Sequence, residues 1–229
     1  MGYIPLFMDV DARLCIVIGS GETALRRVRT LLDAGAEVTA VGRDAGIEAL
    51  GEAGKVHHLN RDYTPGDLRG FALAYVATDN SAVARAAAAE ARELGIPINV
   101  ADAPALCSFL TSAVIRRGAL QIAISTGGLS PALAKALREK FESMLGGEYE
   151  LLLEVLGAAR QRLKLEEQDA QVRSQTLASL AASGLRECFE RRDFDGADRI
   201  LVQHLKCGLA ELGFDGLSAN RVCAGDVPE

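Results

Sequence analysis

The sequence has few of the features that would place it in a membrane, outside the cell or on nucleic acid. No uninterrupted apolar stretch is long enough to cross a bilayer, although 49% of the 229 residues are hydrophobic. Asp9, Asp11 and Arg13 interrupt the N-terminal region, so we expect no signal peptide. The formal net charge is −6, and this acidic balance argues against nucleic acid and anionic membranes as partners.

Cysteine and histidine are also scarce. The cysteines are odd in number and form no C-x-x-C pair, which argues against a disulfide framework and a structural zinc site and suits a reducing cytoplasm. They are Cys15, Cys107, Cys188, Cys207 and Cys223. Of the three histidines, His57 and His58 are adjacent in a predicted strand and should point to opposite faces. We therefore predict a cytoplasmic protein with no resident metal.

The strongest positive signal is an apolar run that leads into a glycine-rich turn. Leu14–Ile18 has the form of a buried strand, and Gly19–Ala24 reads G-x-G-x-x-A. An amphipathic segment and a second strand, Val38–Val41, complete a βαβ unit. Such a turn presents helix N-terminal N–H groups to a phosphate, although a glycine turn without a ligand has the same pattern. The cofactor contacts predicted here are Gly19, Ser20, Gly21, Glu22 and Thr23.

The identity of the dinucleotide is open at this point. An acidic residue at the end of the second strand would bind the ribose 2′-hydroxyl group. Asp44 is one position late for this role, and Arg43 could instead accept a 2′-phosphate. Both residues are candidates for cofactor binding, and their pattern leaves NAD and NADP equally open.

The rest of the chain predicts more of the same sheet and then a change of structure. Phe71–Ala77 and Ile98–Val100 are further buried strands, and Thr78 and Asp79 follow the first of them, where open α/β sheets bind ligands. Further strands are expected at 55–59, 108–115 and 120–125, the last two as a hairpin joined by 116–119, and helices at 81–94, 132–145, 149–164, 172–191 and 196–212. Tyr3–Phe7 is expected to pack on the edge of the first strand.

These patterns predict an α/β fold with three parts. Residues 1–112 form an N-terminal Rossmann domain, residues 113–146 a central α/β segment, and residues 147–218 a small helical C-terminal domain. Residues 219–229 are expected to be a flexible tail.

Five ordered motifs resemble the siroheme synthase N-terminal family, whose members are precorrin-2 dehydrogenases and often also sirohydrochlorin ferrochelatases. The motifs are Tyr3–Phe7, Gly19–Arg27, Ala77–Asp79, Asn99–Pro104 and Ser125–Ala134. The resemblance implies NAD as the cofactor, precorrin-2, an anionic tetrapyrrole, as the substrate, and a homodimer formed through the central segment. It also implies siroheme biosynthesis as the process.

The resemblance assigns the catalytic role to Asp102, the acidic residue of the Asn99–Pro104 motif. Removal of a hydride and a proton from precorrin-2 needs a base. The alternative is that Asp102 caps a turn before Pro104. Cations and backbone N–H groups should receive the substrate carboxylates, and the candidates are Arg116, Arg117, Thr126, Gly127 and Gly128. A solvated turn and a close-packed glycine loop are the alternatives for these residues.

Two functional questions stay open in the sequence. Some relatives are dehydrogenases only, and no histidine of this chain lies in a matching motif, so we expect at most modest metal insertion into sirohydrochlorin. A nucleotide-sensing Rossmann domain without catalysis would explain residues 1–100 but neither the Asp102 motif nor the segment from Thr126 to Ala134. A dehydrogenase for a small substrate would need a His or Lys acid/base at a strand end, and none stands out.

Overall fold

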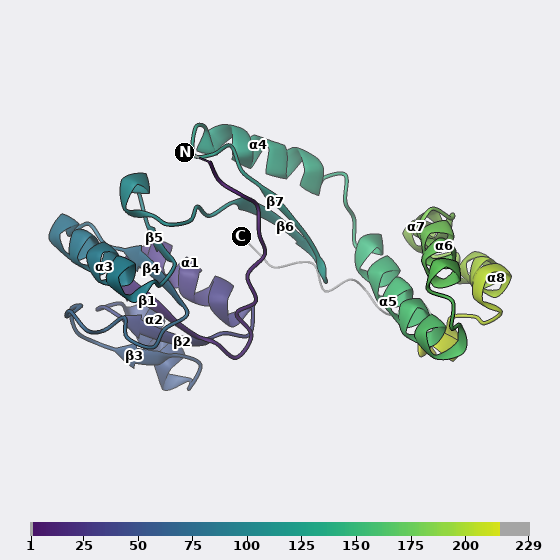
Figure 1. Ribbon diagram of the computed structural model, residues 1–229, viewed down its shortest axis with the longest axis horizontal. Helices are drawn as coiled ribbons and strands as arrows, with labels where there is room; N and C mark the ends of the chain where they lie inside the picture. The colour runs from purple at the N-terminus through teal and green to yellow at the C-terminus, as the bar shows by residue number, and fades with distance from the viewer. Residues whose placement is uncertain (1, 216–229) are drawn as a thin grey trace. The chain divides into compact units, whose positions relative to one another are not determined.

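The structure is a computed structural model that describes residues 2–215. The chain divides into two compact units, Met1–Thr111 with Gly127–Leu129, and Ser112–Thr126 with Ser130–Glu229 (Figure 1). The predicted tail at 219–229 lies outside the described residues, and the three-part division of the chain stays a prediction. Over the described range, none of the helices combines the length and apolarity that a membrane crossing requires.

The first unit is built on a five-stranded parallel sheet. Its strands lie in the order β3-β2-β1-β4-β5. The chain adds β2 and β3 on one side of the central strand β1 and then crosses to the other side of β1 to add β4 and β5, so the strand order reverses between β1 and β4. The strands are β1 (Leu14–Gly19), β2 (Glu37–Val41), β3 (His57–Leu59), β4 (Leu73–Ala77) and β5 (Ile98–Val100). The helices are α1 (Gly21–Leu32), α2 (Ala45–Glu52) and α3 (Ser81–Leu94), and a short 3-10 turn, η1, covers Pro104–Leu106. This confirms the predicted Rossmann-like α/β fold.

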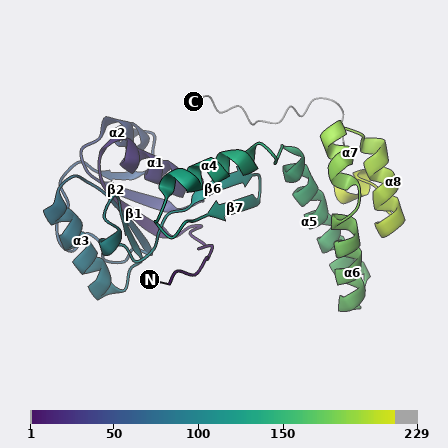
Figure 2. The same ribbon diagram turned by 90° about the horizontal axis from the view of Figure 1, so that it is seen from above.

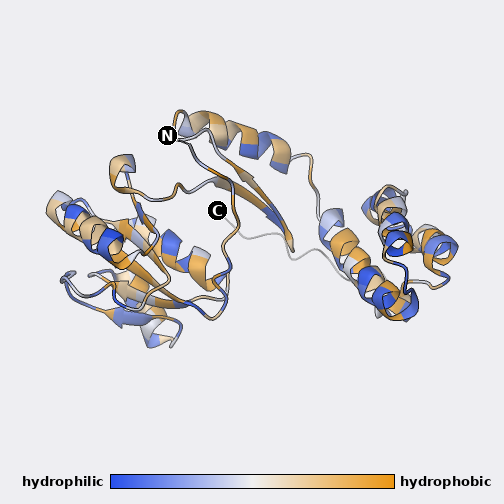
Figure 3. Ribbon diagram, in the orientation of Figure 1, coloured by the Kyte–Doolittle hydropathy of each residue, from blue (hydrophilic) through white to orange (hydrophobic). Residues whose placement is uncertain are grey.

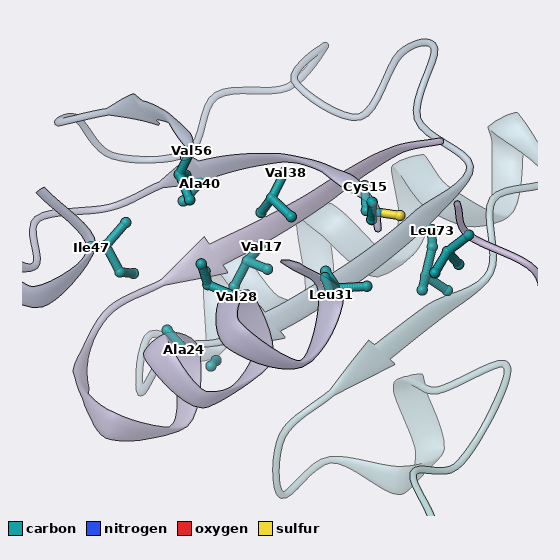
Figure 4. Close-up of a cluster of buried hydrophobic side chains, with 13 residues drawn as sticks. Cys15, Val17, Ala24, Val28, Leu31, Val38, Ala40, Ile47, Val56 and Leu73 are labelled. Carbon is teal, nitrogen blue, oxygen red and sulfur yellow. The ribbon is translucent and has the colours of Figure 1, made fainter. Parts of the chain in front are cut away.

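Both faces of the central strands are buried, which explains why β1 and β4 are almost entirely apolar (Figure 3), whereas the edge strand β3 carries two histidines and is not buried. Helices α1 and α2 pack on one face and α3 on the other (Figure 2). On the first face Ala24, Val28 and Leu31 of α1 meet Val17 and Val38 of the sheet (Figure 4). The face under α3 is lined by small side chains from that helix, Ala84, Ala87, Ala88 and Ala91. Alanines let α3 lie close to the sheet.

Strand β5 is an edge strand whose outer edge is covered. Backbone bonds from Ala74 N to the Pro97 oxygen (2.9 Å) and from Ala101 N to the Val76 oxygen (2.8 Å) join it to β4. The backbone groups of Ile98 and Val100 therefore point outward. Residues 107 and 108 cover them with side-chain and backbone hydrogen bonds. This edge is thus sealed without a sixth strand.

The second unit contains an antiparallel hairpin and the remaining helices. Strand β6 (Ala113–Arg117) pairs with β7 (Leu120–Ile124), and α4 (Pro131–Glu142) packs against both. The predicted helix start is confirmed, because Ser130 Oγ accepts a hydrogen bond from Leu133 N (3.2 Å) and Pro131 is the first helical residue. The other elements are α5 (Glu148–Glu166), α6 (Ala170–Ala181), α7 (Leu185–Arg191), α8 (Phe194–Leu205) and the 3-10 turn η2 (Ala210–Leu212). Helices α5 to α8 share one buried core.

Several predicted elements are wrong in their extent. The helix expected at 172–191 is two helices, because the chain turns at Ser183 and Gly184 between α6 and α7. The helix expected at 196–212 already ends at Leu205, because the next residue, Lys206, adopts a left-handed conformation (φ 57°). The strand expected at 108–115 begins at Ala113. Arg116 and Arg117 belong to β6, so the hairpin turn is shorter than predicted.

The N-terminal motif does not pack on the first strand as predicted. Residues 2–10 form no strand or helix, and the side chains of this stretch are mainly exposed. Ile4 is 81% exposed and Phe7 is 70% exposed. Exposed apolar segments of this kind are typical of interaction surfaces.

Candidate functional site

The glycine-rich loop after β1 combines one packed glycine with one open glycine. A Cβ atom on Gly19 (φ 128°) would lie 1.8 Å from the Ala77 oxygen, so only glycine allows β1 to end beside β4. Gly21 (φ 81°) would place a Cβ in open space, with nothing within 4 Å. The loop is also held by a hydrogen bond from Ser20 N to the Ala77 oxygen (3.2 Å). Gly19 thus shapes the loop, while Gly21 leaves its backbone accessible to a ligand.

The N-terminus of α1 is suited to a phosphate. Ser20 is the N-cap residue but its side chain makes no capping hydrogen bond. The N–H group of Gly21, the first helical residue, donates to Asp44 Oδ2, but those of Glu22 and Thr23 in the first turn have no side-chain acceptor among the described residues. A pyrophosphate above Gly21 would meet these donors and the positive end of the helix dipole. The residues present thus fit a dinucleotide.

Asp44 has a role that the sequence did not indicate. Its Oδ1 accepts a hydrogen bond from Ile47 N (2.9 Å) and caps α2, and its Oδ2 accepts one from Gly21 N (2.7 Å) in the glycine-rich loop. Burial raises the pKa of Asp44, but hydrogen bonds from backbone N–H groups, including those of Ile47 and Gly21, outweigh it and hold the pKa below its usual range. Arg43 donates to Asp62 (3.0 Å) in an exposed ion pair.

The predicted cofactor residues and Asp102 follow strands that end at the same edge of the sheet. Gly19 lies opposite Ala77, and Val76 lies opposite Val100, so Ser20, Thr78 and Asp102 are each the first or second residue past three adjacent strands. Neighbouring strands are about 4.8 Å apart, which places Asp102 two strand spacings, or about 10 Å, from the loop. This edge is where open α/β sheets bind their ligands.

Thr78 and Asp79 differ in their contacts. Thr78 Oγ1 accepts a hydrogen bond from Asn80 N (3.2 Å), and Asn80 caps α3 by accepting bonds from Ala82 N and Val83 N. The Asp79 side chain is exposed and makes no hydrogen bond within residues 2–215. Thr78 therefore shapes the loop after β4, and Asp79 is available to a ligand. Asn80 was missed by the sequence reasoning, although an Asn before a helical segment is a common capping signal.

Asp102 is held in an uncommon conformation with a free side chain. Its φ is 55°, in the left-handed region, and it is exposed. Its carboxylate accepts no hydrogen bond from any residue that the structure describes, and the N-cap of η1 is Ala103, without a side-chain cap. The alternative role of Asp102 as a turn cap thus finds no hydrogen bond to support it. Strained residues with unused polar groups are frequent at active sites.

The two candidate arginines have different surroundings. Arg116 is exposed on β6, opposite Gln121. The Arg117 guanidinium turns to the end of α4, where Nε donates to the Leu145 oxygen (2.8 Å) and Nη2 to the Glu142 oxygen (3.3 Å). An ion pair with the Glu142 carboxylate adds to these bonds (3.5 Å). Arg117 therefore stabilises the end of α4, and Arg116 is the more accessible of the two cations to a ligand.

The loop after β7, which contains the glycine pair, is divided between the units. Thr126 belongs to the second unit, where its Oγ1 donates to the Ser130 oxygen (3.0 Å) and accepts from Ser130 N (3.1 Å). Gly127 (φ 63°) and Gly128 (φ 83°) belong to the first unit. A Cβ on Gly127 would meet nothing within 4 Å. Its glycine identity follows from the backbone conformation and not from close packing.

Comparisons with known proteins agree with these observations. Residues 6–113 match a family model described as "Putative NAD(P)-binding", and residues 117–144 match one described as "Sirohaem biosynthesis protein central". The glycine-rich loop and Asp102 lie in the first match, Arg117 is the first residue of the second match, and Arg116 precedes it by one position.

Curated relatives align with almost the whole chain. A siroheme synthase of Pseudomonas aeruginosa is 39% identical over 218 residues, which are 93% of this chain and 46% of that protein. A siroheme synthase of Methylococcus capsulatus is 36% identical over 208 residues, 86% of this chain and 44% of that protein. The chain thus spans about half the length of these relatives.

A solved structure shares the fold. It is titled "SirC, precorrin-2 dehydrogenase", and its TM-score is 0.72 at 23% identity, covering 89% of this chain and all of that one. These findings confirm the family that the five sequence motifs indicate. The chain belongs to the siroheme synthase family, whose NAD(P)-binding and central domains it carries in consecutive order.

Proposed function

We propose that this chain is an enzyme that oxidises precorrin-2 to sirohydrochlorin with NAD⁺ as the hydride acceptor, a step of siroheme biosynthesis. The names of the siroheme synthase relatives and of the SirC structure support this substrate. The observation that carries the proposal is the free carboxylate of Asp102 on the same sheet edge as the glycine-rich loop.

The glycine-rich loop binds the pyrophosphate of NAD⁺. Gly21 allows the phosphates to approach the backbone, and the first-turn N–H groups of Glu22 and Thr23 donate to them. Asp44 supports NAD⁺ over NADP⁺, because its carboxylate lies at the loop, bonded to Gly21 N, where its negative charge would repel a 2′-phosphate. Arg43, the residue that could have balanced a 2′-phosphate, pairs with Asp62. When bound, the nicotinamide accepts the hydride.

Asp102 accepts the proton that leaves the substrate. Its side chain has no hydrogen-bond partner among residues 2–215, so its lone pairs are available. A positioned base of this kind contributes about 10²- to 10⁴-fold to the rate. The left-handed backbone at Asp102 turns the chain sharply after β5, which keeps this carboxylate near the strand end.

The carboxylates of precorrin-2 bind to Arg116 and to the backbone N–H groups of Thr126, Gly127 and Gly128. Arg116 is exposed and has no acidic partner among the described residues. Gly127 and Gly128 both have positive φ angles in a turn, and successive N–H groups of a turn can form a concave backbone anion site. Arg117 takes part indirectly, because its guanidinium fixes the end of α4 behind β6.

The active protein is a cytoplasmic homodimer formed through the central segment, residues 113–146. A two-stranded sheet is marginally stable alone, and β6 and β7 pair only with each other within the described chain. Apolar side chains are exposed on β6 and on or just after α4, namely Val114, Leu133, Phe141 and Met144. Pairing with a second copy would bury them and satisfy the hairpin edges.

Metal insertion into sirohydrochlorin is at most a modest second activity. The described residues contain no group of three His, Cys, Asp or Glu side chains placed to hold a metal ion. In such a reaction the tetrapyrrole nitrogens would receive the metal ion, and Asp102 would be an available acceptor for the pyrrole protons.

The direct test mixes purified protein with precorrin-2 and NAD⁺ and follows the absorption change to sirohydrochlorin. The proposal expects turnover with NAD⁺, weaker turnover with NADP⁺ and none without a dinucleotide. Cobalt insertion into sirohydrochlorin without NAD⁺ tests the second activity separately. A protein that binds NAD⁺ but leaves precorrin-2 unchanged would be a nucleotide sensor, and the dehydrogenase assignment would be lost.

A further inference from the structure

The segment after η1 replaces a sixth strand at the edge of the sheet. Ser108 N donates to the Ile98 oxygen (2.9 Å), and Ser108 Oγ accepts from Ile98 N (2.8 Å). The Asn99 side chain, which is buried, donates to the Phe109 oxygen (3.0 Å). These bonds fix residues 108 and 109 alongside the first two residues of β5.

Cys107 continues this pattern at the point where β5 ends. Its Sγ accepts a hydrogen bond from Val100 N (3.1 Å) and lies within donor distance of the Val100 oxygen (3.2 Å) and the Ala103 oxygen (3.4 Å). Val100 and Ala103 are the residues on either side of the turn formed by Ala101 and Asp102. A backbone bond from Ala103 N to the Val100 oxygen (3.3 Å) closes the same turn.

The turn needs such a constraint because Asp102 is strained. A left-handed conformation costs a non-glycine residue about 1–2 kcal/mol, and it persists where the surrounding structure holds it in place. The carboxylate of Asp102 makes no hydrogen bond within the described residues that would supply this constraint. The contacts that hold the turn come from the thiol of Cys107, from the backbone bond between Ala103 N and the Val100 oxygen, and from the bond between Ala101 N and the Val76 oxygen of β4.

We infer that Cys107 is a positioning residue that fixes the turn bearing Asp102 and thereby sets the catalytic carboxylate. The inference rests on the proposed function, because it gives Asp102 a catalytic role. The hydrogen bonds of Cys107 Sγ go to the protein backbone and the Asn99 amide, and the side chain also packs against the core under α3, so it acts through Asp102 and not on the substrate. This role could not be inferred from the sequence, where Cys107 is one of five scattered cysteines.

The test compares Cys107→Ala with Ser108→Ala. Both substitutions remove side-chain hydrogen bonds to the outer edge of β5, but the bonds of Ser108 go to Ile98, away from the turn. We expect Cys107→Ala to lower kcat by roughly tenfold to a hundredfold, because a misplacement of about 1 Å can cost a hundredfold. The KM for NAD⁺ should stay within about twofold. Cys107→Ser, which keeps a donor and an acceptor, should recover most of kcat, and Ser108→Ala should keep it.

A second readout does not depend on activity. In ¹⁵N-labelled protein the amide resonances of Ala101, Asp102 and Ala103 should shift or broaden in Cys107→Ala and stay in place in Ser108→Ala. Unchanged resonances, a kcat within twofold of the wild type, or an equal loss of kcat in both variants would overturn the inference. Wild-type protein without dehydrogenase activity would end the proposed function, while the resonances would still decide whether Cys107 fixes the turn.

Discussion

The open space above Gly21 allows nucleotide binding to be separated from folding. Gly21→Ala adds one methyl group at φ 81° without a clash, since nothing lies within 4 Å of the new Cβ. A left-handed alanine costs about 1–2 kcal/mol, and the reduced freedom of the unfolded chain returns about 0.4–1 kcal/mol. We therefore expect a loss of about 1 kcal/mol in the free energy of unfolding. The methyl group would stand where the pyrophosphate approaches, and NAD⁺ affinity should fall at least tenfold.

Gly95→Ala is the matched control. Gly95 ends α3 at φ 70°, and a Cβ there would also meet nothing within 4 Å, so the strain is similar. It lies at the end of α3 away from the loops that follow the strands. Gly95→Ala should lose a similar amount of stability and bind NAD⁺ like the wild type.

The assay is urea unfolding with and without NAD⁺, together with calorimetric titration. At a concentration one hundred times the wild-type Kd, NAD⁺ should stabilise the wild type and Gly95→Ala by about 2.7 kcal/mol. A tenfold weaker affinity reduces this gain to about 1.4 kcal/mol for Gly21→Ala. Equal gains in the two variants would refute the argument that the pyrophosphate lies against Gly21.

Four further substitutions test the remaining roles. Asp102→Asn, which tolerates the left-handed backbone, should lower kcat about 10²- to 10⁴-fold with NAD⁺ affinity unchanged by titration. Asp44→Asn should lower the free energy of unfolding at neutral pH, because a carboxylate whose pKa is lowered by folding stabilises the fold at pH values above its usual pKa near 4. In urea unfolding, the difference in free energy between the variant and the wild type should shrink as the pH falls from about 6 to about 3. Arg116→Gln should raise the KM for precorrin-2 several-fold with the melting temperature unchanged. Arg117→Lys should lower the free energy of unfolding by about 1–2 kcal/mol with little change in the KM for precorrin-2. A stability loss in Arg116→Gln together with a raised KM in Arg117→Lys would contradict these roles.

Local signals in the sequence were sufficient for most of the secondary structure. The apolar runs of β1 and β4 and the alanine-rich α3 have the expected type, and Ser130 with Pro131 marks the start of α4. The break between α6 and α7 was missed because the residues around Ser183 and Gly184 continue a helical spacing on both sides. There the packing of two short helices on α5 decides the structure, and no local pattern reports it.

The candidate site was predictable in its position and not in its contacts. The end of a parallel strand places Asp102 at the ligand-binding edge from sequence alone. Its left-handed conformation depends on bonds between β5 and residues that follow η1, and the bond from Gly21 N to Asp44 joins residues 23 positions apart. Such contacts follow from the three-dimensional register of the sheet, which residue types do not encode locally.

The sealed edge of β5 fixes the length of the loop that carries Asp102. Surface loops usually tolerate insertions and deletions, but here the six residues from Ala101 to Leu106 must return the chain to Val100 and Ile98 in one register. Adding or removing one residue would shift the segment after the loop by one position and change which of its groups face the edge of β5. Relatives that vary in this loop should therefore change its side chains while they keep its length.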